Sequence, residues 1–381
     1  MMRFILVSMA WIFTLPVLLG CTEPAGEQGT VFAVNPISFL SEGFEDVTGY
    51  SQASDDYSFA FPRDHGSHEE FKNEWWYLTG NLQDDNANHY GFQLTIFRSS
   101  INQIPPNRNT NWGVRNVYMG HFTITDTANG RFLQHEKFSR DSLNLAGSSD
   151  KELNVWIEDW FITGEGSDQD PIIIDAKTGA FSLQLDLVSR KPIVLQGDDG
   201  FSVKSSDGEA ASHYYSMTRL DAKGSIQING ATKAVTGTAW MDREWSSTSL
   251  GKNHSGWDWF ALHLSDGSDL MYYRMRLANG EEDATSGGMV NSESGDVIKL
   301  SAEEFTLKVV DYWRSPKDGP IYPAKWVLEI PRLNVELLIQ PVLANQELQG
   351  VFRYWEGAVS CFDKNSVKAM DCKGYVELTG Y

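Results

Sequence analysis

The fold is decided by one stretch, Glu74–Arg98, which reads EWWYLTGNLQDDNANHYGFQLTIFR. Two runs of aromatic and β-branched residues flank a turn rich in Asp and Asn, which is the pattern of an antiparallel hairpin. The same order returns in Asp258–Arg276, DWFALHLSDGSDLMYYRMR. A strand–turn–strand segment follows each copy, His121–Phe132 after the first and Gly288–Ile298 after the second. The repeat predicts two related β modules, with a boundary just before Trp257.

Short runs of this kind continue along the chain after Phe59, separated by Gly, Asn and Asp clusters at the spacing of a sandwich or barrel. No long stretch combines a helical period with helix caps. A single core stops growing at about 250–300 residues, so a chain of 381 residues should divide. We therefore predict an all-β protein of two tandem antiparallel domains, residues 57–248 and 249–381, each of them a sandwich or a barrel.

The charge composition argues against one class of partner. The chain has 31 Lys and Arg against 51 Asp and Glu, a net charge of −20, whereas nucleic-acid binding needs a basic face. We expect no nucleic acid as a partner. No Walker or dinucleotide glycine pattern stands out, and we expect no cofactor.

Residues 1–20 read as a secretory signal, with a positive start and an apolar run, Ile5–Gly20, that is too short and too N-terminal for a spanning helix. The run ends in Leu18-Leu19-Gly20-Cys21, which resembles the bacterial lipobox and implies acylation of Cys21. The alternative is an ordinary signal with an incidental cysteine. Thr22 stands where inner-membrane retention usually has Asp, so we expect a lipid anchor at the periplasmic face of the outer membrane. Residues 21–56 read as a tether.

The other two cysteines, Cys361 and Cys372, bracket a short polar loop. In an oxidising compartment they are expected to form a disulfide, worth roughly 2–3 kcal/mol by loop-closure entropy. A metal site is the alternative, but no His or further Cys lies near them in sequence.

Five motifs are spread in order from about Phe61 to Tyr381. They are FPRDHGSHEEFKNEWWYLTGNL (61–82), GTAWMDREWSS (237–247), SGWDWFALHL (255–264), YPAKWVLEIP (322–331) and GYVELTGY (374–381). Together they resemble the AttH / carotenoid 1,2-hydratase (hydroxyneurosporene synthase-like) family. The resemblance implies two lipocalin-like (calycin-type) barrels. It implies a reaction much less closely, because the family includes a hydratase, cyclisation enzymes and secreted proteins of unassigned role.

A lipocalin-like barrel can hold one apolar ligand inside it or in the groove between barrels. Aromatic side chains would line that site, or alternatively plug the barrel core. The residues expected to bind ligand are Trp75, Trp76, Tyr77, Trp245, Trp257 and Trp259. Strand alternation places the rings of Trp75 and Trp76 on opposite faces, and we expect Arg98 over one of them in a cation–π contact.

In the hydratase branch, a His-x-aromatic pair followed by an aromatic-x-Asp pair is regarded as catalytic. His213-Tyr214-Tyr215 and Trp240-Met241-Asp242 match that order, although Tyr215 and Trp240 differ from the aromatics of the hydratases. The resemblance implies that His213, Tyr215, Trp240 and Asp242 line one cavity near the junction of the barrels.

In that cavity Asp242 would be a protonated general acid, because an apolar site raises the pKa of a carboxyl group. The rings of Tyr215 and Trp240 would stabilise a cation, and His213 would orient Asp242 or water. The alternative is that Asp242-Arg243-Glu244 is an ion-paired strand end that locks the barrels together.

His65 and His68, with Asp64 and Glu74, have residue types suited to zinc, but their segment also reads as a polar loop. We expect no metal there and leave the role of the two histidines open. Ser67 lacks the G-x-S-x-G context of a hydrolase nucleophile.

Two function classes remain. The first is an envelope lipoprotein that binds a lipophilic, isoprenoid or lipid-like ligand and that the resemblance associates with ABC-type exporters. The second is a hydratase or isomerase that adds water to a polyene or isoprenoid double bond. Lipidation favours the first class. Carotenoid precursors lie in the inner membrane, and a protein tethered to the outer membrane would reach them poorly. The sequence leaves open whether the protein is an enzyme.

The lipobox reading predicts that Cys21→Ser abolishes lipid attachment and processing by signal peptidase II. Intact mass measurement of the mature wild-type protein should show a diacylglycerol adduct. A mature protein without that adduct would contradict the lipobox reading.

Overall fold

The computed structural model describes residues 47–103, 112–167, 169–248, 250–316, 319–363 and 371–381. The predicted signal, Cys21 and most of the tether lie outside the described residues. In the described ranges, no helix is long and apolar enough to cross a membrane.

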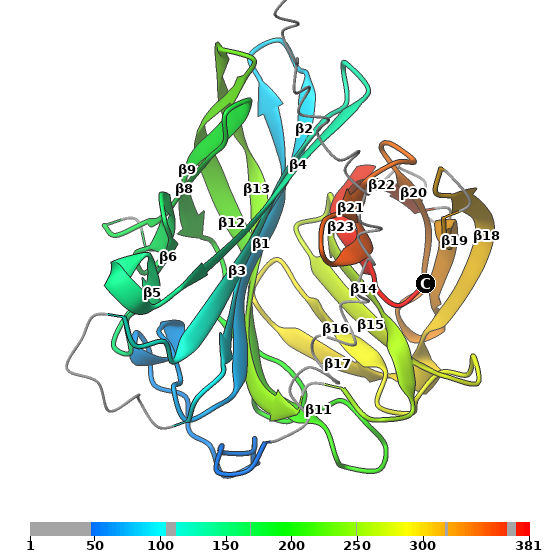
Figure 1. Cartoon of the computed structure of the whole chain (residues 1–381). Coiled ribbons are helices and arrows are strands. Elements are labelled where there is room, and N and C mark those ends of the chain that lie inside the picture. The colour runs from blue at the N-terminus through cyan, green and yellow to red at the C-terminus, as the bar shows by residue number, and fades with distance from the viewer. Residues whose placement is uncertain (1–46, 104–111, 168, 249, 317–318, 364–370) are drawn as a thin grey trace, which may run out of the picture. The chain divides into compact units, whose positions relative to one another are not determined.

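Two antiparallel sheets follow one another along the chain, and the change of sheet falls between Thr248 and His254 (Figure 1). The first sheet contains β1 (Asn73–Asp84), β2 (His89–Ser100), β3 (Asn116–Asp126), β4 (Arg131–Arg140), β5 (Ala146–Ser148), β6 (Asn154–Ile157), β7 (Trp160–Thr163), β8 (Ile172–Lys177), β9 (Phe181–Ser189), β10 (Val194–Leu195), β11 (Phe201–Val203), β12 (Ala211–Ile228) and β13 (Ala231–Thr248).

The second sheet contains β14 (His254–His263), β15 (Asp269–Leu277), β16 (Gly287–Asn291), β17 (Val297–Ser301), β18 (Thr306–Arg314), β19 (Ile321–Ile330), β20 (Val335–Pro341), β21 (Glu347–Gln349), β22 (Arg353–Asp363) and β23 (Asp371–Leu378). Short 3₁₀ turns lie at η1 (Arg63–His65), η2 (Ser142–Asn144), η3 (Ala302–Glu304) and η4 (Pro331–Leu333).

The two sheets share one strand plan. In the first, β4-β3-β2-β1 continues into the last strand, β13, and then β12; in the second, β17-β16-β15-β14 continues into the last strand, β23, and then β22. The repeated hairpins of the sequence are β1–β2 and β14–β15, and their echoes are β3–β4 and β16–β17. The topology therefore confirms the predicted repeat.

Each sheet curls around its own apolar core. Strand β4 lies against β5 and β6 from the other end of the first sheet, which brings that sheet close to closure. The sheets form a near-barrel and a half-barrel, so the prediction of an all-β protein with two lipocalin-like domains is confirmed (Figure 1).

Strand burial shows which part of the first sheet is covered from outside. Strand β9 buries Phe181, Leu183 and Leu185 toward the core and exposes Gln184 and Asp186, as expected of a strand with one wet face. Strand β1, in contrast, is buried on both faces over most of its length, and β13 is buried on both faces from Ala239 to Ser247. Their outer face packs against the second sheet in a third apolar cluster, which includes Tyr77, Tyr214, Trp240, Trp259, Met271 and Tyr375.

A buried charge cluster lies inside the first barrel. Glu74 on β1 forms ion pairs with Arg98 on β2 and Arg243 on β13, and all three side chains are fully buried. Burial alone would raise the pKa of Glu74, but the two guanidinium groups hold it well below its ordinary value. Glu74 is therefore a carboxylate that balances two buried cations.

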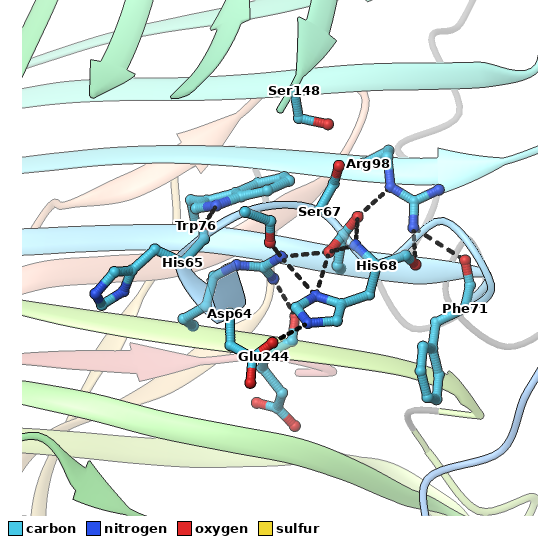
Figure 2. Close-up of polar contacts among 12 residues, drawn as sticks. Asp64, His65, Ser67, His68, Phe71, Trp76, Arg98, Ser148 and Glu244 are labelled. Carbon is cyan, nitrogen blue, oxygen red and sulfur yellow. Dashed lines mark hydrogen bonds and ion pairs between the residues drawn. The ribbon is translucent and has the colours of Figure 1, made fainter. Parts of the chain in front are cut away.

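The same cluster ties the segment before β1 to the sheet. Arg98 donates hydrogen bonds to the backbone oxygens of His68 and Phe71, at 3.0 and 2.9 Å (Figure 2). The imidazole of His68 lies 3.2 Å from Asp64 and stacks on Trp245 with ring centroids 3.7 Å apart. The loop that contains the predicted histidines is therefore packed into the barrel.

The prediction that Arg98 lies over Trp75 or Trp76 is wrong, because among the described residues another guanidinium, that of Arg243, occupies this position. Trp76 lies in the first core, and the guanidinium of Arg243 is 4.0 Å from its ring centroid. The register pairs Trp76 with Arg243 directly. The predicted opposite orientation of the two tryptophans is confirmed, since Trp75 packs in the outer cluster.

Cys361 on β22 and Cys372 on β23 are direct cross-strand partners, with Cα atoms 4.7 Å apart. They are joined by a disulfide within the second core. The bond fastens the last strand to its neighbour in the half-barrel.

We predict that Glu74→Gln lowers the free energy of unfolding by about 3–5 kcal/mol, because it leaves two buried guanidinium groups poorly compensated. Urea denaturation measures this loss. Glu304→Gln is the control, since it removes an ion pair between partly exposed Glu304 and Arg332 and should change stability little. Equal effects of the two substitutions would contradict a stabilising role for the Glu74 cluster.

The disulfide predicts that peptide mapping without reduction finds Cys361 and Cys372 in one linked pair. Reduction should lower stability by roughly 2–3 kcal/mol. Alkylation of both cysteines in the unreduced folded protein would show that the bond does not form.

Candidate ligand-binding and active site

An aromatic pocket lies where the outer face of the first sheet meets the second sheet. It contains about 760 Å³ of space free of atoms, its open mouth included. The lining residues on the side of the first sheet are Trp75, Tyr77, Phe97, Lys204, Tyr214, Asp242 and Glu244, and those of the second sheet are Trp257, Trp259, Tyr273, Met275, Tyr354 and Glu377.

The register of three strands builds the wall that the first sheet contributes. Tyr77 on β1 pairs with Asp242 on β13, which pairs with Ser216 on β12. Residues directly opposite one another share a face of the sheet. One row of side chains therefore points from the first barrel toward the second sheet.

Asp242 is the best-supported candidate for chemistry. Its carboxyl group accepts hydrogen bonds from Ser216, from the indole of Trp240 (2.7 Å) and from the hydroxyl of Tyr214 (2.8 Å). In the described part of the chain, no ion pair reaches it. Burial raises the pKa of Asp242 to about 7, because these hydrogen bonds only partly offset the loss of water.

Two further carboxyl groups come from the second sheet, that of fully buried Glu356 and that of partly exposed Glu377. Glu356 on β22 and Glu377 on β23 are cross-strand partners, and the hydroxyl of Tyr77 donates to Glu356. Burial raises the pKa of Glu377 to about 7, against an opposing hydrogen bond from Trp257. Burial and the neighbouring Glu377 raise the pKa of Glu356 well above its ordinary value.

The fourth carboxyl group of the site, that of Glu244, forms an ion pair. Nζ of Lys204 lies 3.0 Å from Glu244, which also accepts a hydrogen bond from Ser212. The same ammonium group lies over the rings of Tyr214 and Tyr273, 4.6 and 5.1 Å from their centroids. Lys204 therefore neutralises Glu244 and forms part of the pocket wall.

The expectation that His213, Tyr215, Trp240 and Asp242 line one cavity is wrong. Tyr215 pairs with Arg243 and His213 pairs with Trp245, both of which face the barrel core. Strand alternation then places Trp240 and Asp242 on the opposite face. The sheet itself separates the two pairs.

Inside the barrel, the predicted catalytic histidine belongs to an aromatic cluster. The ring of His213 packs against the ring of Tyr57, with centroids 4.3 Å apart. Burial lowers the pKa of His213 to about 4. The hydroxyl of Tyr215 lies 2.6 Å from Nδ1 of His65. His213 and Tyr215 therefore do not contact the carboxyl group that they were expected to serve.

The six predicted ligand-binding aromatics also divide between the two faces. Trp75, Tyr77, Trp257 and Trp259 line the pocket. Trp76 and Trp245 are fully buried in the first core, where their rings fill the interior of the barrel.

The alternative prediction was that Asp242-Arg243-Glu244 forms one ion-paired lock between the barrels. These three residues also lie on two different faces of the sheet. Arg243 pairs with Glu74 inside the barrel, and Glu244 pairs with Lys204 outside it. Asp242 stays with neutral donors. The three consecutive residues belong to two environments.

Sequence reasoning missed Tyr214, Lys204, Glu356 and Glu377. The segment GYVELTGY places Glu377 between apolar residues of a strand, and this alternation is equally typical of a residue that faces water, so it did not mark the site. Tyr214 lay between the two residues chosen from its triplet. Lys204 lies between β11 and β12, where nothing in the sequence marks it.

The histidine segment does not offer open ligands for zinc. Nε2 of His68 faces Asp64, while both oxygens of Glu74 are engaged by arginines. Across the residues with described positions, no group of three or more His, Cys, Asp or Glu side chains could hold a metal ion.

Comparison with known proteins gives a consistent assignment. The model of the AttH-like family matches residues 52–381. A presumed AttH from Nitrosomonas europaea is 30% identical, with a TM-score of 0.77 over 87% of this chain and 99% of that one. Kievitone hydratase from Nectria haematococca is similar in fold, with 14% identity and a TM-score of 0.65 over 87% of this chain and 96% of its own. No curated protein matches the chain in sequence. The chain belongs to the AttH-like family.

Proposed function

We propose that the pocket binds an apolar, unsaturated ligand and that Asp242 protonates one of its double bonds, so that the protein acts as a hydratase-like enzyme. The observation that carries the proposal is the setting of Asp242: a buried carboxyl group with a pKa raised to about 7, at the wall of an aromatic pocket. Such a group is still partly protonated near neutral pH and can act as an acid. The name of kievitone hydratase, a protein of similar fold, agrees with this reaction class.

The reaction would run in two steps. The proton of the Asp242 carboxyl group moves to one carbon of the double bond, and the other carbon becomes a carbocation. The aromatic rings around the pocket stabilise that cation through their faces. A water molecule then adds its oxygen to the cation and loses one proton to a carboxylate.

Glu377 is placed to assist the second step, because it lines the same pocket from the opposite sheet. Its pKa is also raised to about 7 by burial, so it can exchange a proton near neutral pH. The acid and the base come from different sheets, so only the contact between the two sheets would bring them together. His213 and Tyr215 have no role in this scheme, since they lie on the other face.

A carrier is the second candidate. The aromatic lining suffices to hold a lipophilic molecule without turnover, and the lipobox-like Leu18–Cys21 favours a lipoprotein at the cell envelope. Anchoring at the outer membrane, and service to an ABC-type exporter, belong to this candidate as proposals from the sequence.

The enzyme proposal predicts that Asp242→Asn lowers turnover of an isoprenoid polyene by about 10²-fold or more, because it removes the transferable proton. Ligand affinity should stay within about twofold, since Asn keeps the shape of the side chain. The assay is incorporation of ¹⁸O from labelled water, followed by mass spectrometry. Wild-type activity should fall as the pH rises above about 7 and Asp242 ionises.

One control checks the binding site, and the measurement of ¹⁸O incorporation separates the two candidates. Trp257→Ala should weaken ligand loading by about 1–3 kcal/mol in either case, because it removes apolar contact. If Asp242→Asn leaves ¹⁸O incorporation at the wild-type rate, the acid role is wrong. If no ligand gains ¹⁸O while loading stays intact, the carrier is supported instead.

Stability gives an independent check on the acid. The folded state raises the pKa of Asp242 from 3.8 to about 7, so its protonated form is the one that folding favours. This contribution is complete below about pH 4 and is lost as the pH rises through about 7. The difference in unfolding free energy between wild type and Asp242→Asn should change in the same range.

A further inference from the structure

We propose that this pocket is built to hold positive charge, and that it binds small organic cations, such as an aryl quaternary ammonium ion, in exchange for protons. The inference concerns the pocket of the proposed function and rests on its being the ligand site. It does not depend on whether turnover occurs there. It adds a class of ligand to the site.

The first support is an excess of acid over base. Three carboxyl groups line the pocket, Asp242 and Glu244 from β13 and Glu377 from β23. A fourth, Glu356 on β22, lies beside them as the cross-strand partner of Glu377. The charged base among the lining residues is Lys204, which is already paired with Glu244. Three carboxyl groups therefore remain without a cation in the described part of the chain.

The second support is a polar atom without a partner. Glu356 is fully buried, and its Oε1 accepts a hydrogen bond from Tyr77. Its Oε2 has no hydrogen-bond partner among the residues whose positions are described. A buried carboxyl oxygen left in this state is costly unless a proton or a cation reaches it.

The third support is the use that the pocket already makes of its rings. The Lys204 ammonium lies over the faces of Tyr214 and Tyr273. The rings of Trp75, Trp257 and Trp259 line the remaining wall. Aromatic faces combined with carboxylates are the chemistry that recognises quaternary ammonium groups.

These features connect ligand charge to protonation. Without a bound cation, the ionised forms of Asp242, Glu356 and Glu377 repel one another, and their raised pKa values keep these groups partly protonated near neutral pH. A cation in the pocket favours the ionised forms. Binding should therefore release protons, and the affinity should increase as the pH rises through about 7.

Other titratable groups around the pocket do not replace this coupling. Burial raises the pKa values of Tyr77, Tyr214 and Tyr354 above their ordinary value, so these hydroxyls stay neutral. His121 lies behind Tyr354, 2.7 Å from its hydroxyl, with its other ring nitrogen 3.1 Å from Glu136.

The test compares phenyltrimethylammonium with tert-butylbenzene, which has the same shape without the charge. Tryptophan fluorescence titrations on the whole protein at pH 6, 7 and 8 give the affinities. We expect the cation to bind at least tenfold more tightly than the neutral probe at pH 8, and about tenfold more tightly at pH 8 than at pH 6. Calorimetry at pH 7 in two buffers of different ionisation enthalpy should show proton release.

Matched variants locate the effect. Glu377→Gln should weaken cation binding at pH 8 by about tenfold and leave tert-butylbenzene within twofold. Glu293→Gln removes the same charge from an exposed position and should change neither probe. Because proton release is measured on the wild type, the test does not depend on the folding of a variant.

Equal affinities for the two probes at pH 8, or cation binding without proton release, would overturn the inference. An unchanged cation affinity in Glu377→Gln would do the same. The outcomes are separable from those of the proposed function. Cation preference without ¹⁸O incorporation leaves this inference standing, whereas ¹⁸O incorporation without cation preference leaves only the hydratase standing.

Discussion

Strand β13 is buried on both faces from Ala239 to Ser247, and the candidate site depends on that burial. Its side chains alternate between the barrel core, which receives Arg243 and Trp245, and the contact with the second sheet, which receives Trp240 and Asp242. An ordinary barrel strand would expose its outer residues to water, where a carboxyl group keeps an ordinary pKa. The second sheet removes that water and makes the outer face of the first barrel a wall of the pocket.

The two faces treat buried acids in opposite ways. Inside the barrel, Glu74 is ionised because two guanidinium groups offset its desolvation. At the outer face, Asp242 has only neutral donors, so desolvation dominates and its pKa rises. Both acids are buried, and the difference between them is the charge of their partners. The first arrangement stabilises a fold, whereas the second provides a group that can exchange protons.

Membership of the AttH-like family establishes the architecture more firmly than the chemistry. One such fold can carry several functions, because the function depends on the side chains of the site. Here the relevant side chains come from both sheets, with Asp242 on one and Glu377 on the other. The repeated strand plan explains this, because the central strands of the two sheets meet face to face in the outer apolar cluster.

The sequence by itself determined the β class, the repeat and the opposite orientations of Trp75 and Trp76. Each of these follows from local alternation and turn composition, which are properties of neighbouring residues. It also selected Asp242, through a motif that resembles the hydratases.

Only the tertiary structure decided which residues share a face with Asp242. Alternation relates residues within one strand, but a shift of one residue in pairing exchanges the faces between two strands. The pairing of β12 with β13 contains such shifts, at Ala211/His213 and at Met217/Leu220. Tyr214 therefore faces the pocket, whereas His213 faces the core. Glu377 joins them from a strand more than a hundred residues further along the chain, and no local pattern in the sequence encodes that approach.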